Sequence, residues 1–288
     1  MSTDTLDATS APDTTRPRRP VLTVSDLRIA LDDGTELVRG VDFSLAPGEA
    51  LGIVGESGSG KSLTCRAVLG ILPGGIDVTA GSIDFDGIEL TDLGRKQWRP
   101  LRGTRIAAVF QDPASYLNPS IRVGEQLAEA LRSTLGLSRA DARRRGVELF
   151  RKMGLTDADT VYRQYPHELS GGMLQRVLIA IAVSAEPELL IADEATTALD
   201  VTVQAEVLDL LEDLRQELGL ALVLVSHDLA VVAQVCDRVI VMRDGAVVES
   251  GRAEDLLTAP RHEYTRQLVD NHREYGLESF IGQEAARV

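Results

Sequence analysis

Short apolar runs separated by turns containing glycine and aspartate fill the first part of the chain after residue 20. Apolar positions that alternate or run together over a few residues are typical of strands. The pattern predicts strands, some of them antiparallel, over 21–31, 36–45, 50–54 and 81–90. We therefore expect a β-subdomain made from residues of about 21–50 and 78–92.

The pattern changes after residue 60, where helical spacing begins to alternate with short, continuously apolar runs. Such runs are typical of strands that are buried on both faces. The predicted core strands are 105–110, 189–192, 221–225 and 239–242, and a helix is predicted over 63–72. This alternation indicates an α/β core.

No strand pattern is found between about residues 113 and 166. Residues 124–134 and 139–153 instead carry helical spacing, which predicts a helical insert of about 113–170 within the α/β core. Residues 253–288 have helical spacing with a weak core pattern, and we expect them to form a C-terminal helical extension. Residues 1–20 are rich in Thr, Asp, Pro and Arg without periodicity, which favours a disordered tail. The main domain is therefore expected over 21–252.

Composition and charge narrow the possible functions. The chain has 288 residues, 44% of them hydrophobic, and a formal net charge of -14. Such an acidic surface argues against general binding to nucleic acid or anionic lipid. The apolar runs are too short to span a bilayer, and the N-terminus does not resemble a secretory signal. A role at a membrane would thus need another chain. Cys65 and Cys236 lack metal-site spacing and are expected to be buried thiols.

A glycine-rich segment, GESGSGKS at residues 55–62, joins the strand predicted at 50–54 to the helix predicted at 63–72. This GxxxxGKS pattern in a strand–loop–helix setting predicts a phosphate-binding loop. Its glycines let backbone N–H groups surround phosphates, and the helix directs its positive end toward them. Lys61 would reach the β- and γ-phosphates and Ser62 would bind Mg²⁺. The predicted binding residues of this phosphate loop are Gly55, Glu56, Ser57, Gly58, Ser59, Gly60, Lys61, Ser62 and Leu63.

Two acidic residues follow the apolar run at 189–192. A phosphate loop of this kind works with a carboxylate at the end of a second core strand, which holds Mg²⁺. Asp193 is the candidate for that role. Glu194 comes next and is placed to orient or deprotonate an attacking water.

A second candidate anion site precedes the helix predicted at 174–185, whose apolar circumference indicates deep burial. Ser170, Gly171 and Gly172 would leave backbone N–H groups exposed at the start of that helix. Since the phosphate loop already surrounds the phosphates of its own nucleotide, this second site would complete the pocket of another subunit. We call residues 169–173, LSGGM, the signature segment.

These motifs, in this order, resemble the ABC ATPase family over roughly residues 21–270. The resemblance implies ATP hydrolysis with Mg²⁺ on an α/β P-loop core that carries an antiparallel β-subdomain and a helical insert. It implies that Gln111 is the Q-loop glutamine and a Mg²⁺ ligand beside Ser62 and Asp193. Asp200 resembles the D-loop aspartate, and His227 resembles the histidine that contacts the γ-phosphate. The implied catalytic residues are Lys61, Gln111, Glu194 and His227.

Longer matches point to the branch that imports oligopeptides, dipeptides and nickel. QDPASYLNP at 111–119, YPHELSGGM at 165–173 and APRHEYT at 259–265 resemble segments of that branch. The resemblance implies two transmembrane permease subunits and a second ABC ATPase, expected to be a sister chain. It further implies an extracytoplasmic solute-binding protein acting indirectly, a peripheral location on the cytoplasmic face of the cell membrane, and no nucleic acid.

The sequence departs from that branch at two functional positions. Ala195 stands where proline usually follows the catalytic glutamate, which we expect only to loosen the turn. Leu31 ends the segment RIAL at 28–31, where the branch has an aromatic residue that stacks on adenine. A leucine can pack on the base without aromatic stacking, so nucleotide affinity or base selectivity is expected to suffer.

Three alternatives compete with this interpretation. A soluble ABC ATPase that acts on DNA or ribosomes would carry tandem cassettes, coiled coils or zinc cysteines, and no heptad run separates Lys61 from Ser170. A regulatory subunit without hydrolysis conflicts with the intact Asp193 and Glu194, although the missing aromatic keeps it open. An ordinary P-loop kinase has no use for the signature segment.

Overall fold

The computed structural model describes residues 19–195 and 199–274, and side chains only as far as residue 270. Most of the predicted N-terminal tail and residues 275–288 of the predicted extension lie outside these ranges. One sheet is antiparallel, in the order β2-β1-β4-β5. Its strands are β1 (Leu22–Leu31), β2 (Glu36–Leu45), β4 (Ile76–Phe85) and β5 (Ile88–Glu89).

The strand predicted over 81–90 differs from the observed strands. Strand β4 begins at Ile76, because its first half pairs with the end of β1 in the register Leu31↔Ile76. It ends at Phe85, where Asp86 and Gly87 have φ of 49° and 83°. Positive φ at both central residues is the geometry of a tight hairpin turn. The turn separates β4 from β5.

The second sheet has the order β10-β9-β3-β8-β7-β6. Strands β9, β3, β8, β7 and β6 run parallel to one another, and β10 pairs with β9 in the antiparallel direction. The bounds are β3 (Ala50–Val54), β6 (Ile106–Phe110), β7 (Leu189–Asp193), β8 (Ala221–Ser226), β9 (Arg238–Arg243) and β10 (Ala246–Arg252). Sequence analysis missed β10. The Asp244-Gly245 pair, with φ of 51° and 81°, is the hairpin signal that could have identified it.

The parallel sheet is buried on both faces, which explains its continuously apolar strands. Successive side chains of a strand point to opposite faces. In β7, for example, Leu190 and Ala192 join one hydrophobic cluster with the helices α4–α9, whereas Leu189 and Ile191 join another with the antiparallel sheet and α1. The α/β core and the antiparallel β-subdomain predicted from the sequence are confirmed.

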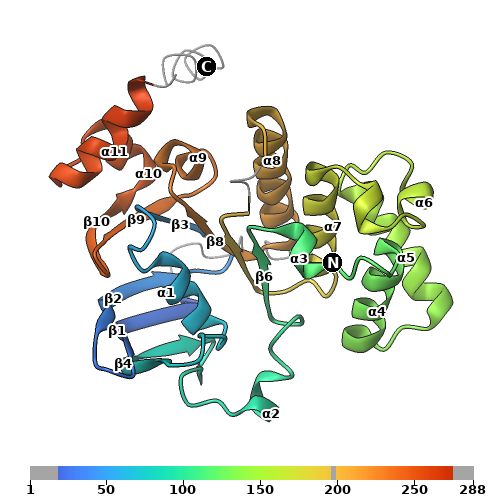
Figure 1. Cartoon of the computed structure of the whole chain (residues 1–288), viewed down its shortest axis with the longest axis horizontal. Coiled ribbons are helices and arrows are strands. Elements are labelled where there is room, and N and C mark those ends of the chain that lie inside the picture. The colour runs from blue at the N-terminus through green and yellow to red at the C-terminus, as the bar shows by residue number, and fades with distance from the viewer. Residues whose placement is uncertain (1–18, 196–198, 275–288) are drawn as a thin grey trace, which may run out of the picture.

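Two groups of helices lie on either side of the parallel sheet (Figure 1). In Figure 1 the antiparallel sheet lies at the lower left, helices α3–α7 gather at the right, and α9–α11 lie at the upper left, around the parallel sheet. The helices before the signature segment are α1 (Lys61–Val68), α2 (Arg95–Trp98), α3 (Pro113–Tyr116), α4 (Val123–Leu135), α5 (Arg139–Lys152), α6 (Ala158–Val161) and the short 3₁₀ helix η1 (Pro166–Glu168). The later ones are α7 (Gly171–Val183), α8 (Val201–Leu218), α9 (Leu229–Ala233), α10 (Ala253–Thr258) and α11 (Glu263–Glu274). From Pro113 to Glu168 the chain forms helices and no strand.

One further expectation, that of buried thiols, is met within the described ranges. Cys65 and Cys236 are buried free thiols, and burial raises the pKa of both above the ordinary value. Of the helices that the structure describes, none has the length and apolar character needed to cross a membrane.

Candidate functional site

The carboxyl ends of four neighbouring strands meet at one edge of the parallel sheet. The register pairs Val54 of β3 with Ser226 of β8, Val225 of β8 with Asp193 of β7, and Asp193 with Phe110 of β6. Each strand is followed at once by a predicted site residue: Gly55, His227, Glu194 and Gln111. Ligands of open α/β sheets bind beyond this edge. Segments that lie far apart in the sequence therefore form one site.

The phosphate loop connects β3 to α1 and needs glycine at its first position. Gly55 has φ of 154°, and a Cβ atom there would lie 2.1 Å from the carbonyl oxygen of Met242. No side chain fits in that space. Gly60 precedes α1 in a left-handed conformation, with φ of 98°. Its lack of a Cβ lets the loop turn directly into the helix.

Lys61 is held inside the phosphate loop. Its side chain is 4% exposed, and its Nζ donates to the carbonyl oxygens of Gly55 at 2.7 Å and Glu56 at 2.8 Å. Burial lowers the pKa of Lys61, while the carboxylates of Glu194 and Asp193 oppose that shift. The loop thus combines a buried cation with the N-terminus of a helix, which suits an anion.

Ser62 and Asp193 form an oxygen pair beside Lys61. The Ser62 hydroxyl donates to Asp193 Oδ1 at 3.0 Å, and Asp193 is 5% exposed. Burial raises the pKa of the Asp193 carboxyl, and the Ser62 hydrogen bond opposes this. A hydroxyl and a carboxylate suit Mg²⁺, which takes one or two protein oxygens together with phosphates and water. The described residues contain no cluster of three or more His, Cys, Asp or Glu for a metal held by protein alone. The pair therefore fits Mg²⁺ arriving with a phosphate ligand.

Glu194 follows Asp193 in a strained conformation. Its φ is 51°, a left-handed geometry uncommon for residues other than glycine. Its N–H donates to the carbonyl oxygen of Val225 at 3.0 Å, which fixes the peptide against β8. Such strain is concentrated at functional sites. The partly exposed Glu194 and the exposed His227 follow adjacent strands, and the exposed Gln111 follows β6 on the other side of β7.

The signature segment lies at the start of α7 and packs on α8. Ser170 caps α7 by accepting a hydrogen bond from the N–H of Met173 at 3.3 Å. A Cβ atom on Gly172 would lie 2.5 Å from Val203 Cγ1, so only glycine allows this approach of α7 to α8. Asp200 caps α8 by accepting from the N–H of Val203 at 3.0 Å.

The two predicted anion sites are not joined to each other by hydrogen bonds within the described ranges. The side chain nearest to the Gly171 position is Leu199, beside Asp200. The D-loop residue Ala198 lies outside the described residues. The structure thus brings Ser170, Gly171, Gly172 and Asp200 together as a second group, apart from the strand ends.

Tyr264 contacts the phosphate loop, and the sequence analysis missed it. The hydroxyl oxygen of Tyr264, in α11, accepts a hydrogen bond from the N–H of Glu56 at 2.8 Å. The segment 259–265 was recognised only as a branch motif, and no local signal places it against residue 56.

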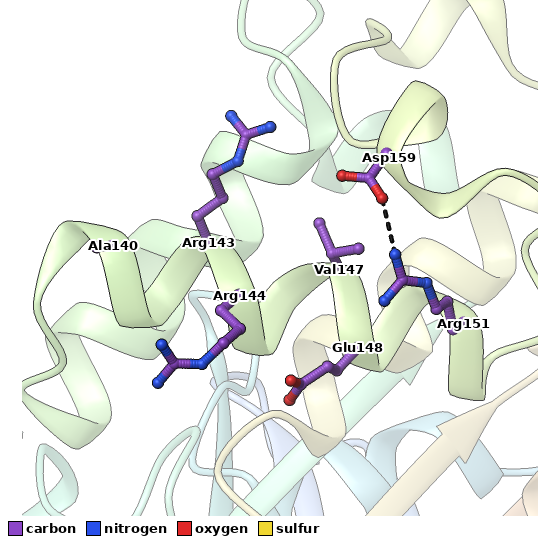
Figure 2. Close-up of a pocket in the computed structure, with 7 residues that line it drawn as sticks. All are labelled: Ala140, Arg143, Arg144, Val147, Glu148, Arg151 and Asp159. Carbon is purple, nitrogen blue, oxygen red and sulfur yellow. Dashed lines mark hydrogen bonds and ion pairs between the residues drawn. The ribbon is translucent and has the colours of Figure 1, made fainter.

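A hollow of 260 Å³ on α5 is rich in arginine but lies elsewhere. Figure 2 shows Arg151 reaching Asp159, while Arg143 and Arg144 extend in other directions from the helix. Arg151 pairs with Asp159 and Arg144 with Asp141, each at 2.7 Å. Because the hollow is lined by α5 and α6 and by none of the residues at the strand ends, it is not part of the candidate site.

Comparisons with known proteins agree on one family. A family model described as "ABC transporter" matches residues 38–197. The dipeptide transport ATP-binding protein DppD of Lactococcus lactis subsp. cremoris is 44% identical, covering 81% of this chain and 67% of its own length. The oligopeptide transport ATP-binding protein OppD of Salmonella typhimurium is also 44% identical, over 91% of this chain and 78% of that protein.

A solved structure is similar as well. It is the dimeric post-hydrolysis state of an ATP-binding cassette bound to ADP and Pi. The TM-score is 0.71 at 27% identity, over 81% of this chain and 98% of the other.

Proposed function

The chain belongs to the ABC transporter ATP-binding family, and from that premise we propose that it hydrolyses ATP to drive uptake of peptides or a similar small solute through partner transmembrane subunits. The observation that carries this proposal is the convergence of Lys61, the Ser62–Asp193 pair and Glu194 at one edge of the parallel sheet. The solute class is supported by relatives named for dipeptide and oligopeptide transport.

The chain's own residues divide the work of hydrolysis. Lys61 exchanges the carbonyl oxygens of Gly55 and Glu56 for the β- and γ-phosphate oxygens. Glu194 accepts a proton from the attacking water as the new bond to the γ-phosphorus forms and the bond to the leaving ADP breaks. His227 and Gln111 contact the γ-phosphate and the water from either side of β7. Ser62, Asp193 and Gln111 would hold Mg²⁺, which would neutralise phosphate charge.

The signature segment acts on the nucleotide of a second subunit. Two cassettes close head to tail, so that Ser170, Gly171 and Gly172 of one face the phosphate loop of the other. The dimeric state of the similar cassette bound to ADP and Pi supports a pairing of two cassettes. We take the second cassette to be a sister chain, on the resemblance to the peptide importer branch, with Asp200 at the contact between the two.

A groove of 490 Å³ beside the Q-loop is the proposed docking surface for the transmembrane partners. Strand β6 and the helices α3, α4 and α7 line it, with Phe110 and Tyr116 stacked at 5.0 Å between ring centroids. Tyr116 is 54% exposed. Gln111 directly follows Phe110, which lines the groove. A shift of Gln111 at the γ-phosphate would therefore move the wall of the groove. The protein then lies on the cytoplasmic face of the membrane. An extracytoplasmic solute-binding protein delivers the solute to the transmembrane subunits and does not contact this chain.

The proposal is tested in cells that lack the gene. Uptake of a labelled di- or oligopeptide should be lost and then restored by the parent chain but not by Lys61→Ala. The tagged parent should purify from detergent-solubilised membranes with two permease subunits and a second ATPase. Normal peptide uptake without the gene would refute the proposed solute, and purification without membrane subunits would refute the transport role.

Replacing Lys61 with alanine should weaken ATP binding at least tenfold. The substitution deletes a buried ammonium, and hydrogen bonds to charged groups contribute about 1.5–3 kcal/mol. Equilibrium ATP binding of the full chain measures the effect. Lys96→Ala, on an exposed side chain of α2, is the matched control and should bind like the parent. Equal binding by Lys61→Ala and Glu194→Gln would show that Lys61 does not serve binding as we assign it.

Replacing Leu31 with tyrosine should tighten ATP binding several-fold and improve discrimination against GTP. Leu31 is 37% exposed at the end of β1, so the position is open to a ligand. Base–aromatic stacking contributes about 1–3 kcal/mol in nucleic-acid complexes. Competition binding with ATP and GTP measures the change, with Leu135→Tyr, exposed at the end of α4, as the control. Unchanged affinity would mean that another residue covers the adenine.

A further inference from the structure

Tyr264 joins the C-terminal part of the chain to the phosphate loop. Its side chain is 1% exposed, although its polar hydroxyl must be satisfied when buried. That hydroxyl accepts the N–H of Glu56 at 2.8 Å, across 208 residues of sequence. The Glu56 donor is therefore engaged by Tyr264, while the Glu56 carbonyl faces Lys61 at 2.8 Å.

The position of Tyr264 is fixed by several contacts of its own segment. The Glu249 carboxylate in β10 accepts the N–H groups of Arg261 at 2.8 Å and His262 at 3.0 Å. The N–H of Tyr264 donates to His262 Nδ1 at 3.1 Å. The Arg243 guanidinium lies 4.9 Å from the centroid of the Tyr264 ring, a cation–π distance. These contacts fix the position of the Tyr264 hydroxyl.

The hairpin of β9 and β10, which also belongs to the C-terminal part of the chain, contacts the phosphate loop as well. The N–H of Gly245 donates to the carbonyl oxygen of Ser59 at 3.2 Å. Met242, at the end of β9, leaves room only for a glycine at residue 55. Residues after 240 therefore hydrogen-bond the backbone of Glu56 and Ser59 and lie close against Gly55. Gly55 and Glu56 supply the carbonyls that hold Lys61.

We propose that Tyr264 is a positioning residue for ATP binding, which holds Glu56 so that the phosphate loop keeps the shape that places Lys61. A loop ordered before the ligand arrives does not lose ordering free energy on binding. Without the hydroxyl the loop samples other shapes, and the apparent affinity falls by the fraction of time spent in them. The inference rests on the proposed ATP binding and adds a residue to it.

The test is Tyr264→Phe in the full chain, because phenylalanine keeps the ring and its contact with Arg243 and removes only the hydroxyl. A hydrogen bond of this kind corresponds to about a two- to tenfold change in an equilibrium constant. The dissociation constant for ATP, and KM in the assembled transporter, should rise by that factor. The kcat should stay within about twofold of the parent, since the hydroxyl does not touch the reacting atoms.

Tyr162→Phe is the matched control. Tyr162 is 2% exposed and packs in the helical insert. Tyr162→Phe therefore measures how removing a hydroxyl from a buried tyrosine changes stability, without a change at the phosphate loop. It should leave ATP affinity unchanged even where it lowers the Tm. In addition, the amide of Glu56 should exchange its hydrogen faster in Tyr264→Phe than in either the parent or the control.

Each possible result either supports or overturns the proposed role of Tyr264. Weaker ATP binding in Tyr264→Phe alone, with faster exchange at Glu56, supports the inference. Equal ATP affinity in parent and Tyr264→Phe overturns it and leaves the proposed function intact, even if the Tm falls. A kcat that drops as much as kcat/KM also overturns it, because Tyr264 would then act on the chemical step. Failure of the parent to bind ATP refutes the proposed function and, with it, this inference.

Discussion

A Glu194→Gln chain is expected to bind ATP as the parent does and to lose most of its turnover. An amide cannot accept the proton of the attacking water, and loss of a general base typically costs about 10²–10⁴-fold. The structure keeps the two effects separate. The Glu194 peptide is held by its bond to Val225, which an isosteric change leaves in place. Lys61 and Ser62 lie at the start of α1, in the segment after β3.

The measurement is the rate of phosphate release by the assembled transporter at saturating ATP, together with equilibrium ATP binding. Glu254→Gln, an exposed carboxylate in α10, is the control and should turn over normally. In the proposed mechanism hydrolysis reopens the pair of cassettes, so Glu194→Gln should also accumulate as an ATP-bound closed dimer. Turnover within about threefold of the parent would remove Glu194 from the role of base.

Ser170→Arg should abolish both ATP-driven dimerisation and hydrolysis while sparing ATP binding by the single subunit. An arginine would fill the space in which a phosphate has to approach the backbone N–H groups of α7. Ser170 is exposed, so the change does not disturb a core, and its cap on Met173 is a single bond of 3.3 Å. Binding survives because no hydrogen bond joins Ser170 to the phosphate loop in the described residues.

Light scattering of the Glu194→Gln chain with ATP, with and without Ser170→Arg, measures dimerisation. Ser250→Arg, exposed on the edge strand β10, tests whether an added arginine is harmful wherever it is placed. A dimer that still forms with Ser170→Arg would mean that the signature segment does not lie at the contact between subunits.

The parts of the site that the sequence predicted are local. GESGSGKS carries its own strand and helix beside it, and Asp193 and Glu194 end a strand recognisable from its apolar run. The register that brings these ends to one edge is not local. It depends on the order β3-β8-β7-β6, which no short segment encodes.

Three features could not be predicted from the local sequence, each for a different reason. The first half of β4 pairs with the end of β1, so the start of β4 cannot be found from its own weak alternation. The strain at Glu194 is imposed by the bond to Val225 in the neighbouring strand. Tyr264 lies 208 residues from its partner Glu56, and its segment gives no sign of that contact. By contrast, β10 had a visible Asp-Gly turn signal.

The central claim is that each ATP pocket combines the phosphate loop of one subunit with the signature segment of the other. Substitutions at Lys61 and Ser170 can be placed on one chain or divided between two. The pair consists of two tagged copies of this chain or, if a sister ATPase purifies with it, of the two chains with changes at corresponding motifs.

ATP turnover of purified mixed pairs is the most direct measurement. In our account, Lys61→Ala on one subunit and Ser170→Arg on the other leave one complete pocket, and turnover persists at a reduced rate. Both substitutions on the same subunit, paired with an unsubstituted one, spoil both pockets and stop turnover. The reverse result, activity with both changes on one subunit and none when they are divided, would contradict the account, because each chain would then use its own signature segment.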